Sequence, residues 1–337
     1  MGGNALKNVV TRRYARDEYL RLKERILSKV REHIDQCDVP REFPCKESFG
    51  DLDVLMVCPP SVKLHDLIEE LFHPTEIFKN GDVYSFDVEQ FQVDFILVPQ
   101  EEFHNAIVYF SYSDLGGLIG NVCHKIGLKY GIQGLWMNVH TKEFDPTTTS
   151  TKLLLSSNPQ DIFAFLGHDY ERYAKGFENA NEFFQWIVEG KYFRRQYFDD
   201  DQLNHAHRQR TSKRPIYIKF IAFLDEHEIP REQPIENRDE LARDVRQQAL
   251  TFFDKQDAYE KGLNARDEKR QFREKYSGKD FLDIGGQKQM IPVHMRNFER
   301  RFGKTDEEFH QWVLNTDVVT IKSEVEKFKQ ELKTNRS

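Results

Sequence analysis

Residues 47–57 read ESFGDLDVLMV, so that a serine and a glycine precede two aspartates that run directly into an apolar segment. Side chains alternate across a β-strand, so Asp51 and Asp53 are expected on one side and Leu52 on the other. Two carboxylates this close repel each other unless a cation lies between them, and hard oxygen ligands suit Mg²⁺. The stretch therefore predicts a metal site at the start of a strand, although a solvated turn before a core strand gives the same pattern.

A second apolar run, FQVDFILV at residues 91–98, contains Asp94 and is typical of a strand. An acidic side chain within a buried strand needs a partner or a metal. If the two strands are neighbours, Asp94 joins Asp51 and Asp53 at one edge of a sheet. Three carboxylates around two Mg²⁺ ions are what two-metal phosphoryl or nucleotidyl transfer requires.

At these residues the sequence resembles the DNA polymerase β-like nucleotidyltransferase superfamily. Its signature is Gly-Ser, a short spacer, Asp-x-Asp in a strand and a third acidic residue in a later strand. Ser48 with Gly50 matches a contracted Gly-Ser element, whereas Glu47 stands where the family has glycine and the spacer is almost absent. The contracted form and the MGGNALK of residues 1–7 are similar to divergent members from large DNA viruses and phages.

The resemblance covers roughly the first 135 residues and implies an α+β fold. A palm-like mixed sheet with flanking helices is expected in a catalytic domain at residues 1–157. Strand patterns fade beyond residue 159, so an all-helical domain that binds nucleotide and acceptor is expected at residues 158–337.

Site residues follow from the same resemblance. Asp51, Asp53 and Asp94 are the expected catalytic residues and ligands of Mg²⁺ or Mn²⁺. The expected contacts to a nucleoside triphosphate are Ser48 and Gly50, together with Ser113, Gly117, Lys125 and Lys129 on or near the glycine-containing helix after the third carboxylate. Glycines that allow close helix packing and lysines in solvent would give the same pattern there.

Residues 205–219 are basic without any acidic residue, a composition that suits contacts to nucleic-acid phosphates. The expected acceptor-binding residues are Arg208, Arg210, Lys213 and Arg214. A solvated loop or helix face is the alternative. His205 and His207 have the spacing of metal ligands but lack a third ligand nearby.

The predicted activity is transfer of a nucleoside monophosphate from a nucleoside triphosphate to an acceptor hydroxyl, with RNA, including a tRNA-like 3′ end, as the first acceptor. DNA gaps, a protein or small-molecule acceptor as in toxin-like relatives, an idle nucleic-acid-binding module and a virion structural protein are the alternatives. Residues 275–286 show a faint similarity to CCA-adding tRNA nucleotidyltransferases. The motifs that read CTP and ATP in the bacterial-type enzymes are missing, so CCA addition is not supported.

Bulk properties restrict the class of protein. The chain has 337 residues, 31% charged and 39% hydrophobic, and a net charge of −7. No apolar run reaches the length of a membrane span and no signal peptide is apparent, so an intracellular protein without membrane contact is expected, in the cytoplasm or, for a viral protein, in the host cytoplasm or nucleus. The four cysteines form no Cys-x-x-Cys and are expected to be reduced. The sequence indicates no particular protein partner.

Local patterns predict the elements. Residues 16–34 and 62–72 have helical spacing, and strands are expected at 53–57, 83–88, 91–98, 136–140 and 152–155. Residues 1–13 are expected to be extended and mobile. Ser111 or Ser113 is expected to cap the glycine-containing helix, and Asn158 or Ser157 the helix that begins at Pro159.

Overall fold

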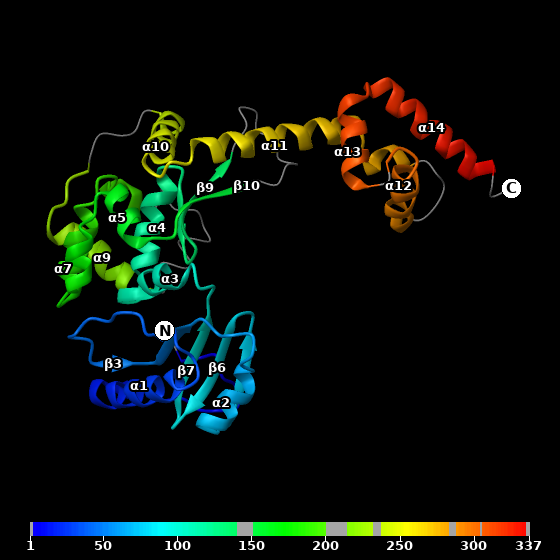
Figure 1. The fold of residues 1–337 in the computed structure, drawn as a ribbon. Helices are drawn as coiled ribbons and strands as arrows, with labels where there is room; N and C mark the ends of the chain where they lie inside the picture. Colours follow the sequence, from blue (N-terminus) through cyan, green and yellow to red (C-terminus); the bar gives the residue numbers. More distant parts are fainter. Residues whose placement is uncertain are drawn as a thin grey trace. The chain divides into compact units, whose positions relative to one another are not determined.

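The structure is a computed structural model that describes residues 3–139, 151–199, 214–231, 237–282, 288–303 and 305–334. It confirms the α+β class, with a mixed five-stranded sheet and a mostly helical C-terminal half (Figure 1). The chain divides into two compact units. The first is Met1–Met137 with Leu154–Lys255, and the second is Asn138–Leu153 with Gln256–Ser337. The domain boundary expected after residue 157 does not coincide with any of these divisions.

The central sheet of the first unit has the strand order β2-β4-β7-β6-β5. Its strands are β2 (Cys37–Asp38), β4 (Asp51–Met56), β5 (Ile77–Asn80), β6 (Val83–Val88) and β7 (Phe91–Leu97). β4 and β7 are parallel, and the other neighbours are antiparallel. Glu89 and Gln90 join β6 to β7 with φ values of 53° and 62°, as a two-residue hairpin turn of the mirror-image type requires.

Side-chain alternation gives this sheet two different faces. Leu52, Val54 and Met56 of β4 pack, with the matching residues of β7, against α1 (Arg16–Arg31) and α2 (Leu64–Phe72). On the opposite face, Leu55 belongs to a smaller apolar cluster with residues of α3 (Phe103–Phe110). Asp51 and Asp53 lie on this second face, at the start of the strand.

Helices make up most of the rest of the first unit. They are α4 (Leu115–Lys125), α5 (Pro159–Leu166), α6 (Tyr170–Lys175), α7 (Ala180–Val188), α9 (Pro215–Glu226) and α10 (Arg238–Phe252), with 3₁₀ turns η1 (Ser111–Ser113) and η2 (Arg195–Phe198). The predicted cap of α5 is confirmed, because the Asn158 side chain accepts a hydrogen bond from the backbone N–H of Gln160. The predicted cap of α4 is wrong: α4 begins after Asp114, and the two serines lie in η1.

Short strands complete the first unit and connect it to the second. β1 (Tyr14–Ala15) pairs with β3 (Ser48–Phe49), and β8 (Lys129–Gly131), β9 (Gly134–Val139) and β10 (Thr151–Ser156) form a sheet in the order β10-β9-β8. The strands expected at 136–140 and 152–155 correspond to β9 and β10. The segment between them, residues 140–150, lies outside the described residues.

Residues 3–13 are held in place, in contrast to the expected mobility. The backbone N–H groups of Lys7 and Asn8 donate to the Glu76 carboxylate at 2.9 and 2.7 Å, and that of Arg12 donates to the Gln90 carbonyl at 2.8 Å. The segment lacks the apolar periodicity of a helix or strand, and hydrogen bonds to distant residues leave no pattern in a sequence. Its ordered arrangement could therefore not be predicted.

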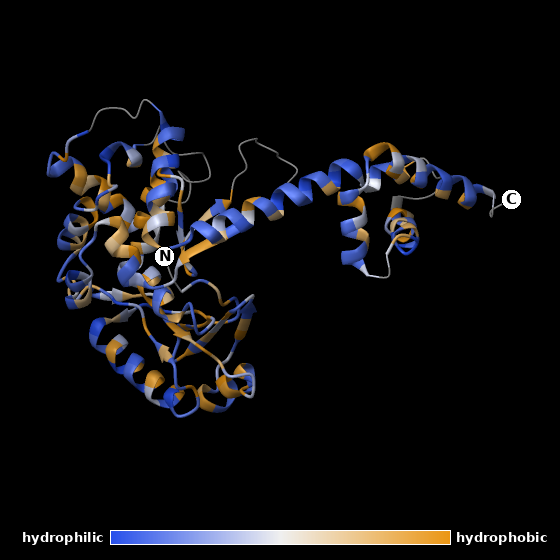
Figure 2. Ribbon diagram, turned by 45° about the horizontal axis from the view of Figure 1, so that its top comes forward, coloured by the Kyte–Doolittle hydropathy of each residue, from blue (hydrophilic) through white to orange (hydrophobic). Residues whose placement is uncertain are grey.

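The second unit is helical apart from its parts of β9 and β10. Its helices are α11 (Gln256–Lys275), α12 (Ile291–Glu299), α13 (Asp306–Asn315) and α14 (Val318–Thr334), with 3₁₀ turns η4 (Gly278–Phe281) and η5 (Lys288–Met290). α11 is largely hydrophilic (Figure 2). A separate apolar core contains Tyr276, Phe281, Phe298, Phe309 and Phe328.

None of the helices that the structure describes, in either unit, has the length and apolar character needed to cross a membrane.

Candidate metal centre and its cavity

Three carboxylates meet on the face of the sheet away from α1 and α2. Asp51 and Asp53 begin β4, and Asp94 lies directly opposite Asp53 on the parallel strand β7. Each residue offers a carboxylate oxygen, and these oxygens all lie within 4.8 Å of one another. Strand alternation and register together therefore bring the three acidic residues of the sequence prediction into one cluster.

The cluster is electrostatically unfavourable without a cation. Burial, together with the neighbouring charges of Asp51 and Asp94, raises the pKa of Asp53 to about 8. Burial also raises the pKa of Asp94, and hydrogen bonds from Ser85 and Gln92 oppose that rise. Carboxylate oxygens are the ligands that Mg²⁺ and Mn²⁺ favour, so this donor set fits either ion.

A second acidic group with metal-binding distances lies on α2, where His65, Asp66 and Glu69 are all exposed. Their side chains are 52–68% exposed, so they form an ordinary charged helix face. They provide a matched control for the sheet cluster.

The sheet cluster opens into a cavity of about 910 Å³ within the first unit. Asp51 and Asp53 line it from β4, whereas Asp94 is not among its lining residues. Ser113, Asp114 and Gly117 line it from η1 and α4, and Arg214, Pro215, Ile216 and Lys219 line it from the start of α9. The cavity also has four cationic side chains, which are Arg13, Lys46, Arg214 and Lys219. Its apolar lining includes Phe43, Tyr109, Phe110 and Ile216. Acidic, basic and aromatic groups thus line one cavity.

Five of the other predicted site residues line this cavity, namely Ser48, Gly50, Ser113, Gly117 and Arg214. Lys125 and Lys129 are not among the residues that line it. The Lys129 ammonium lies 4.6 Å from the ring centre of Trp136 instead, where a cation–π contact holds it. Arg208, Arg210 and Lys213, with His205 and His207, lie outside the described residues.

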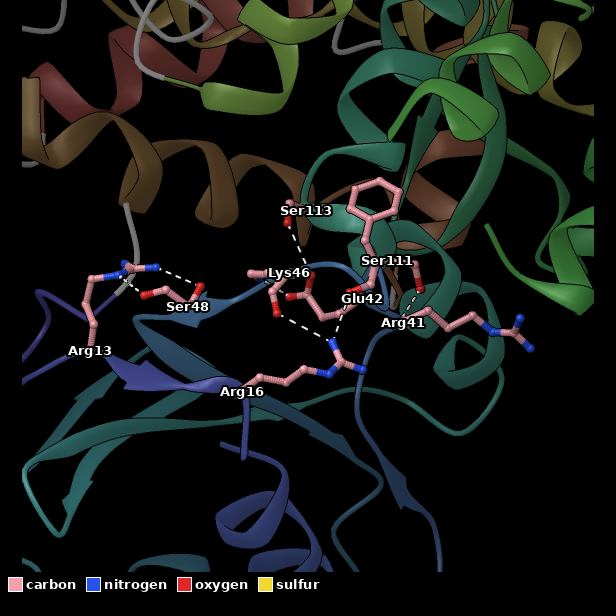
Figure 3. A network of polar contacts seen from close by, with 9 residues as sticks. Arg13, Arg16, Arg41, Glu42, Lys46, Ser48, Ser111 and Ser113 are labelled. Carbon is pink, nitrogen blue, oxygen red and sulfur yellow. Dashed lines mark hydrogen bonds and ion pairs between the residues drawn. The ribbon is translucent and has the colours of Figure 1, made fainter. Parts of the chain in front are cut away.

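Ser48 is bound by an arginine that the sequence prediction did not include. Arg13 Nε donates to Ser48 Oγ at 2.8 Å, and Arg13 Nη2 donates to the Ser48 carbonyl at 2.9 Å (Figure 3). Pairing of β1 with β3 sets Ala15 opposite Ser48 and so brings Arg13 close. The sequence shows that the N-terminal region is basic. It does not show which of the cationic side chains in that region faces the site.

Lys46 and Glu42 form a second polar pair in the cavity wall. Lys46 Nζ donates to Glu42 Oε1 at 2.6 Å, and the charge of Lys46 opposes the rise in the pKa of Asp53. The other Glu42 oxygen accepts a hydrogen bond of 3.5 Å from Ser113 Oγ (Figure 3). Neither residue was predicted, because the loop before β3 has no regular pattern.

Gly117 is required for an ion pair between Asp114 and Arg214. Arg214 Nη1 donates to Asp114 Oδ1, and burial raises the pKa of Asp114 to about 6 although Arg214 lowers it. A Cβ atom at Gly117 would lie 2.2 Å from Asp114 Oδ1 and 2.8 Å from Arg214 Nη1. A larger residue at position 117 would therefore displace one of these two side chains.

The backbone just before α4 is strained. Tyr112 and Ser113 have φ values of 56° and 64°, a left-handed conformation that costs non-glycine residues about 1–3 kcal/mol each. Tyr112 is buried among aromatic rings, and its hydroxyl accepts a hydrogen bond from the Phe177 N–H. Packing around Tyr112 thus holds the turn that presents Ser113 and Asp114 to the cavity.

Comparison of the sequence with models of known protein families gives no match, and comparison with curated protein sequences gives none either.

Proposed function

We propose that the chain is a metal-dependent nucleotidyltransferase with a palm-like catalytic sheet of the DNA polymerase β-like type. It would transfer a nucleoside monophosphate from a nucleoside triphosphate to an acceptor hydroxyl, with an RNA 3′ end as the first acceptor. The observation that carries the proposal is the cluster of Asp51, Asp53 and Asp94 on two parallel strands, open to a cavity with cationic walls.

Asp51, Asp53 and Asp94 are the residues that would hold Mg²⁺ or Mn²⁺. When bound, the ions would lower the pKa of an acceptor hydroxyl and neutralise charge on the triphosphate. The cluster supports this role because its carboxylates repel one another in a partly buried position.

The cationic side chains of the cavity suit the phosphates of the substrate. Arg13 and Ser48 lie together next to the start of β4, and guanidinium groups bind phosphate oxygens in a forked geometry. Arg214 and Lys219 line the same cavity from α9. The aromatic lining of Phe43, Tyr109 and Phe110 would exclude water and could contact a base.

A binding module without activity fits the site less well. Nucleic-acid phosphates are negative, so a module that only bound them would gain nothing from three clustered carboxylates, two of which line its cavity. DNA, protein and small-molecule acceptors remain alternatives within the same chemistry, and the acceptor panel of the experiment separates them.

The test is a label-transfer assay. The protein is incubated with Mg²⁺ or Mn²⁺, each labelled nucleoside or deoxynucleoside triphosphate, and RNA, DNA, protein and small-molecule acceptors. The expected result is metal-dependent transfer that Asp51→Asn/Asp53→Asn abolishes. The matched control, Asp66→Asn/Glu69→Gln on α2, removes two carboxylates of the exposed group and should leave transfer unchanged. Transfer that persists in Asp51→Asn/Asp53→Asn would refute the proposal.

A further inference from the structure

Gln92 connects the candidate metal site to the N-terminal segment. It lies on β7 opposite Asp51, on the same face of the sheet as the three aspartates, and it is 2% exposed. Gln92 Nε2 donates to Asp94 Oδ1 at 3.0 Å and to Oδ2 at 2.9 Å, and Gln92 Oε1 accepts from the backbone N–H of Ala5 at 2.9 Å. Both ends of the buried amide are therefore engaged, and the amide can make this set of bonds in only one orientation.

The segment that holds Gln92 is itself anchored at its two ends. Gly3 lies so close to the start of β4 that a Cβ atom there would be 2.4 Å from the Gly50 carbonyl oxygen, and Thr11 Oγ1 donates to the Gly3 carbonyl at 2.7 Å. The Glu76 carboxylate accepts from the Lys7 and Asn8 N–H groups. The Asp87 carboxylate in turn accepts from the Thr75 and Glu76 N–H groups at 2.8 and 2.9 Å.

We propose that residues 3–12 contribute to metal binding at the site. They do so through Gln92, a positioning residue that fixes the orientation of the Asp94 carboxylate. A single amide nitrogen bonded to both carboxylate oxygens fixes the rotation of Asp94 about its terminal torsion angle. This torsion is otherwise broad, so an unheld Asp94 would present its oxygens to the ion less often. Partners that orient metal ligands typically contribute a factor of about 10–100 in metal affinity.

The inference rests on the proposed metal site, but Mn²⁺ binding tests it without any assumption about the acceptor. Gln92→Met keeps the length and volume of the side chain and removes all three hydrogen bonds. The expected result in a titration of free Mn²⁺ by electron paramagnetic resonance is an affinity about tenfold weaker than that of the unaltered protein.

A double-mutant cycle separates positioning from general loosening of the fold. Gln92→Met should have no further effect on Mn²⁺ affinity in an Asp94→Asn background, because the group that Gln92 positions is already altered. In the transfer assay, Gln92→Met should raise the Mn²⁺ concentration needed for half-maximal rate, while KM for the nucleotide at saturating Mn²⁺ stays unchanged.

Gly3→Ala tests the segment itself and serves if Gln92→Met fails to fold. Its Cβ would displace the segment from Gly50, so Mn²⁺ affinity should fall by roughly threefold or more. Gly81→Ala is the matched control, because Gly81 also has a positive φ, +59° against +86° at Gly3, but a Cβ there meets nothing within 4 Å. It should leave Mn²⁺ affinity unchanged.

The two proposals fail in different ways. If the unaltered protein transfers label and binds Mn²⁺, but Gln92→Met and Gly3→Ala bind it equally well, the role of Gln92 and the segment is refuted and the proposed function stands. If Asp51→Asn/Asp53→Asn and the unaltered protein show the same Mn²⁺ binding, no ion is held by the cluster and both proposals are refuted.

Discussion

Asp53 is the residue at which the charge balance of the candidate site is most sensitive to pH. Its pKa of about 8 lies above its ordinary value of 3.8, because the side chain is buried beside Asp51 and Asp94. Between roughly pH 4 and pH 8, the folded protein therefore retains a proton that the unfolded chain has released. The contribution of Asp53 to stability accordingly falls as the pH rises through this window. A bound cation would offset this loss of stability, because it neutralises the charge of the Asp53 carboxylate.

The substitution Asp53→Asn tests this balance. At pH 8 without metal, we expect the variant to be more stable than the unaltered protein by about 1–2 kcal/mol, since the neutral amide removes the like-charge repulsion. At pH 5 the difference should shrink, because Asp53 is then protonated in the folded state. The measurement is urea unfolding at both pH values, with and without Mn²⁺.

Mn²⁺ should stabilise the unaltered protein at pH 8 and leave Asp53→Asn almost unaffected. The exposed variant Asp66→Asn is the control and should respond to Mn²⁺ as the unaltered protein does. A variant Asp53→Asn that is less stable than the unaltered protein at pH 8 would contradict the account of Asp53 as a repelled carboxylate.

Residue types and strand alternation were enough to identify the acidic cluster from the sequence. Asp51, Asp53 and Asp94 stand out because carboxylates are rare inside apolar strands. Arg13, Lys46 and Gln92 could not be identified, because each reaches the site through contacts with residues distant in the sequence or through an irregular loop. A lysine or arginine in a basic region gives no sign of which one faces inward.

At the scale of elements, α4 combines helix formation with close packing at its N-terminal end. Its glycines lower helix propensity by roughly 1 kcal/mol each relative to alanine, so a glycine there needs a packing reason. Gly117 has one, because it faces the Asp114–Arg214 pair. At Gly120 the nearest atom to an added Cβ is the Tyr130 carbonyl oxygen at 3.6 Å, an ordinary contact distance.

Gly117→Ala and Gly120→Ala therefore form a matched pair within one helix. We expect Gly117→Ala to displace Asp114 or Arg214, to lower the free energy of unfolding by about 1–3 kcal/mol, and to weaken nucleotide binding. Gly120→Ala should instead raise stability by about 0.5–1 kcal/mol and leave binding unchanged. Thermal unfolding and nucleotide titration measure the two effects, and equal effects of the two substitutions would contradict the role given to Gly117.

Elements with a regular apolar pattern were predictable, and the others were not. α1, α2 and the β6–β7 hairpin follow from helical spacing, alternation and turn length. β5 is mostly exposed and β2 has two residues, so neither shows an alternating pattern. α3 is mainly apolar and buries Asn105, Ala106 and Val108. Its sequence shows no clear helical periodicity, so no helix was predicted there.

At the scale of the whole molecule, the chain enters the second unit twice. Residues 138–153 belong to it by their contacts, although they lie between β-strand segments of the first unit. One of these contacts is the hydrogen bond from Arg266 to the Val139 carbonyl, which joins residues far apart in the sequence. A boundary near residue 157 was inferred from the loss of strand patterns, and a change in local pattern carries no information about such contacts.

Separate cores imply that the two units can be destabilised separately. Phe298 is 0% exposed and packs against Tyr276, Phe281 and Phe309 in the second unit. Phe86 is also 0% exposed and lies in the sheet core of the first unit, against Phe72 and Phe95. Replacing either ring by alanine leaves a cavity that costs roughly 3–5 kcal/mol.

Phe298→Ala should therefore lower the unfolding temperature of one calorimetric transition and leave the Mn²⁺ affinity of the Asp51, Asp53 and Asp94 cluster unchanged. Phe86→Ala should lower the unfolding temperature of a different transition and weaken Mn²⁺ binding. The reason is that Phe86 packs against Phe95, which lies on the same strand as Asp94. Calorimetry with and without Mn²⁺ assigns the transitions, since only the one that contains the metal site should move with the ion. If both substitutions shift a single common transition and weaken Mn²⁺ binding equally, the chain unfolds as one cooperative structure and the stability of the site depends on both cores.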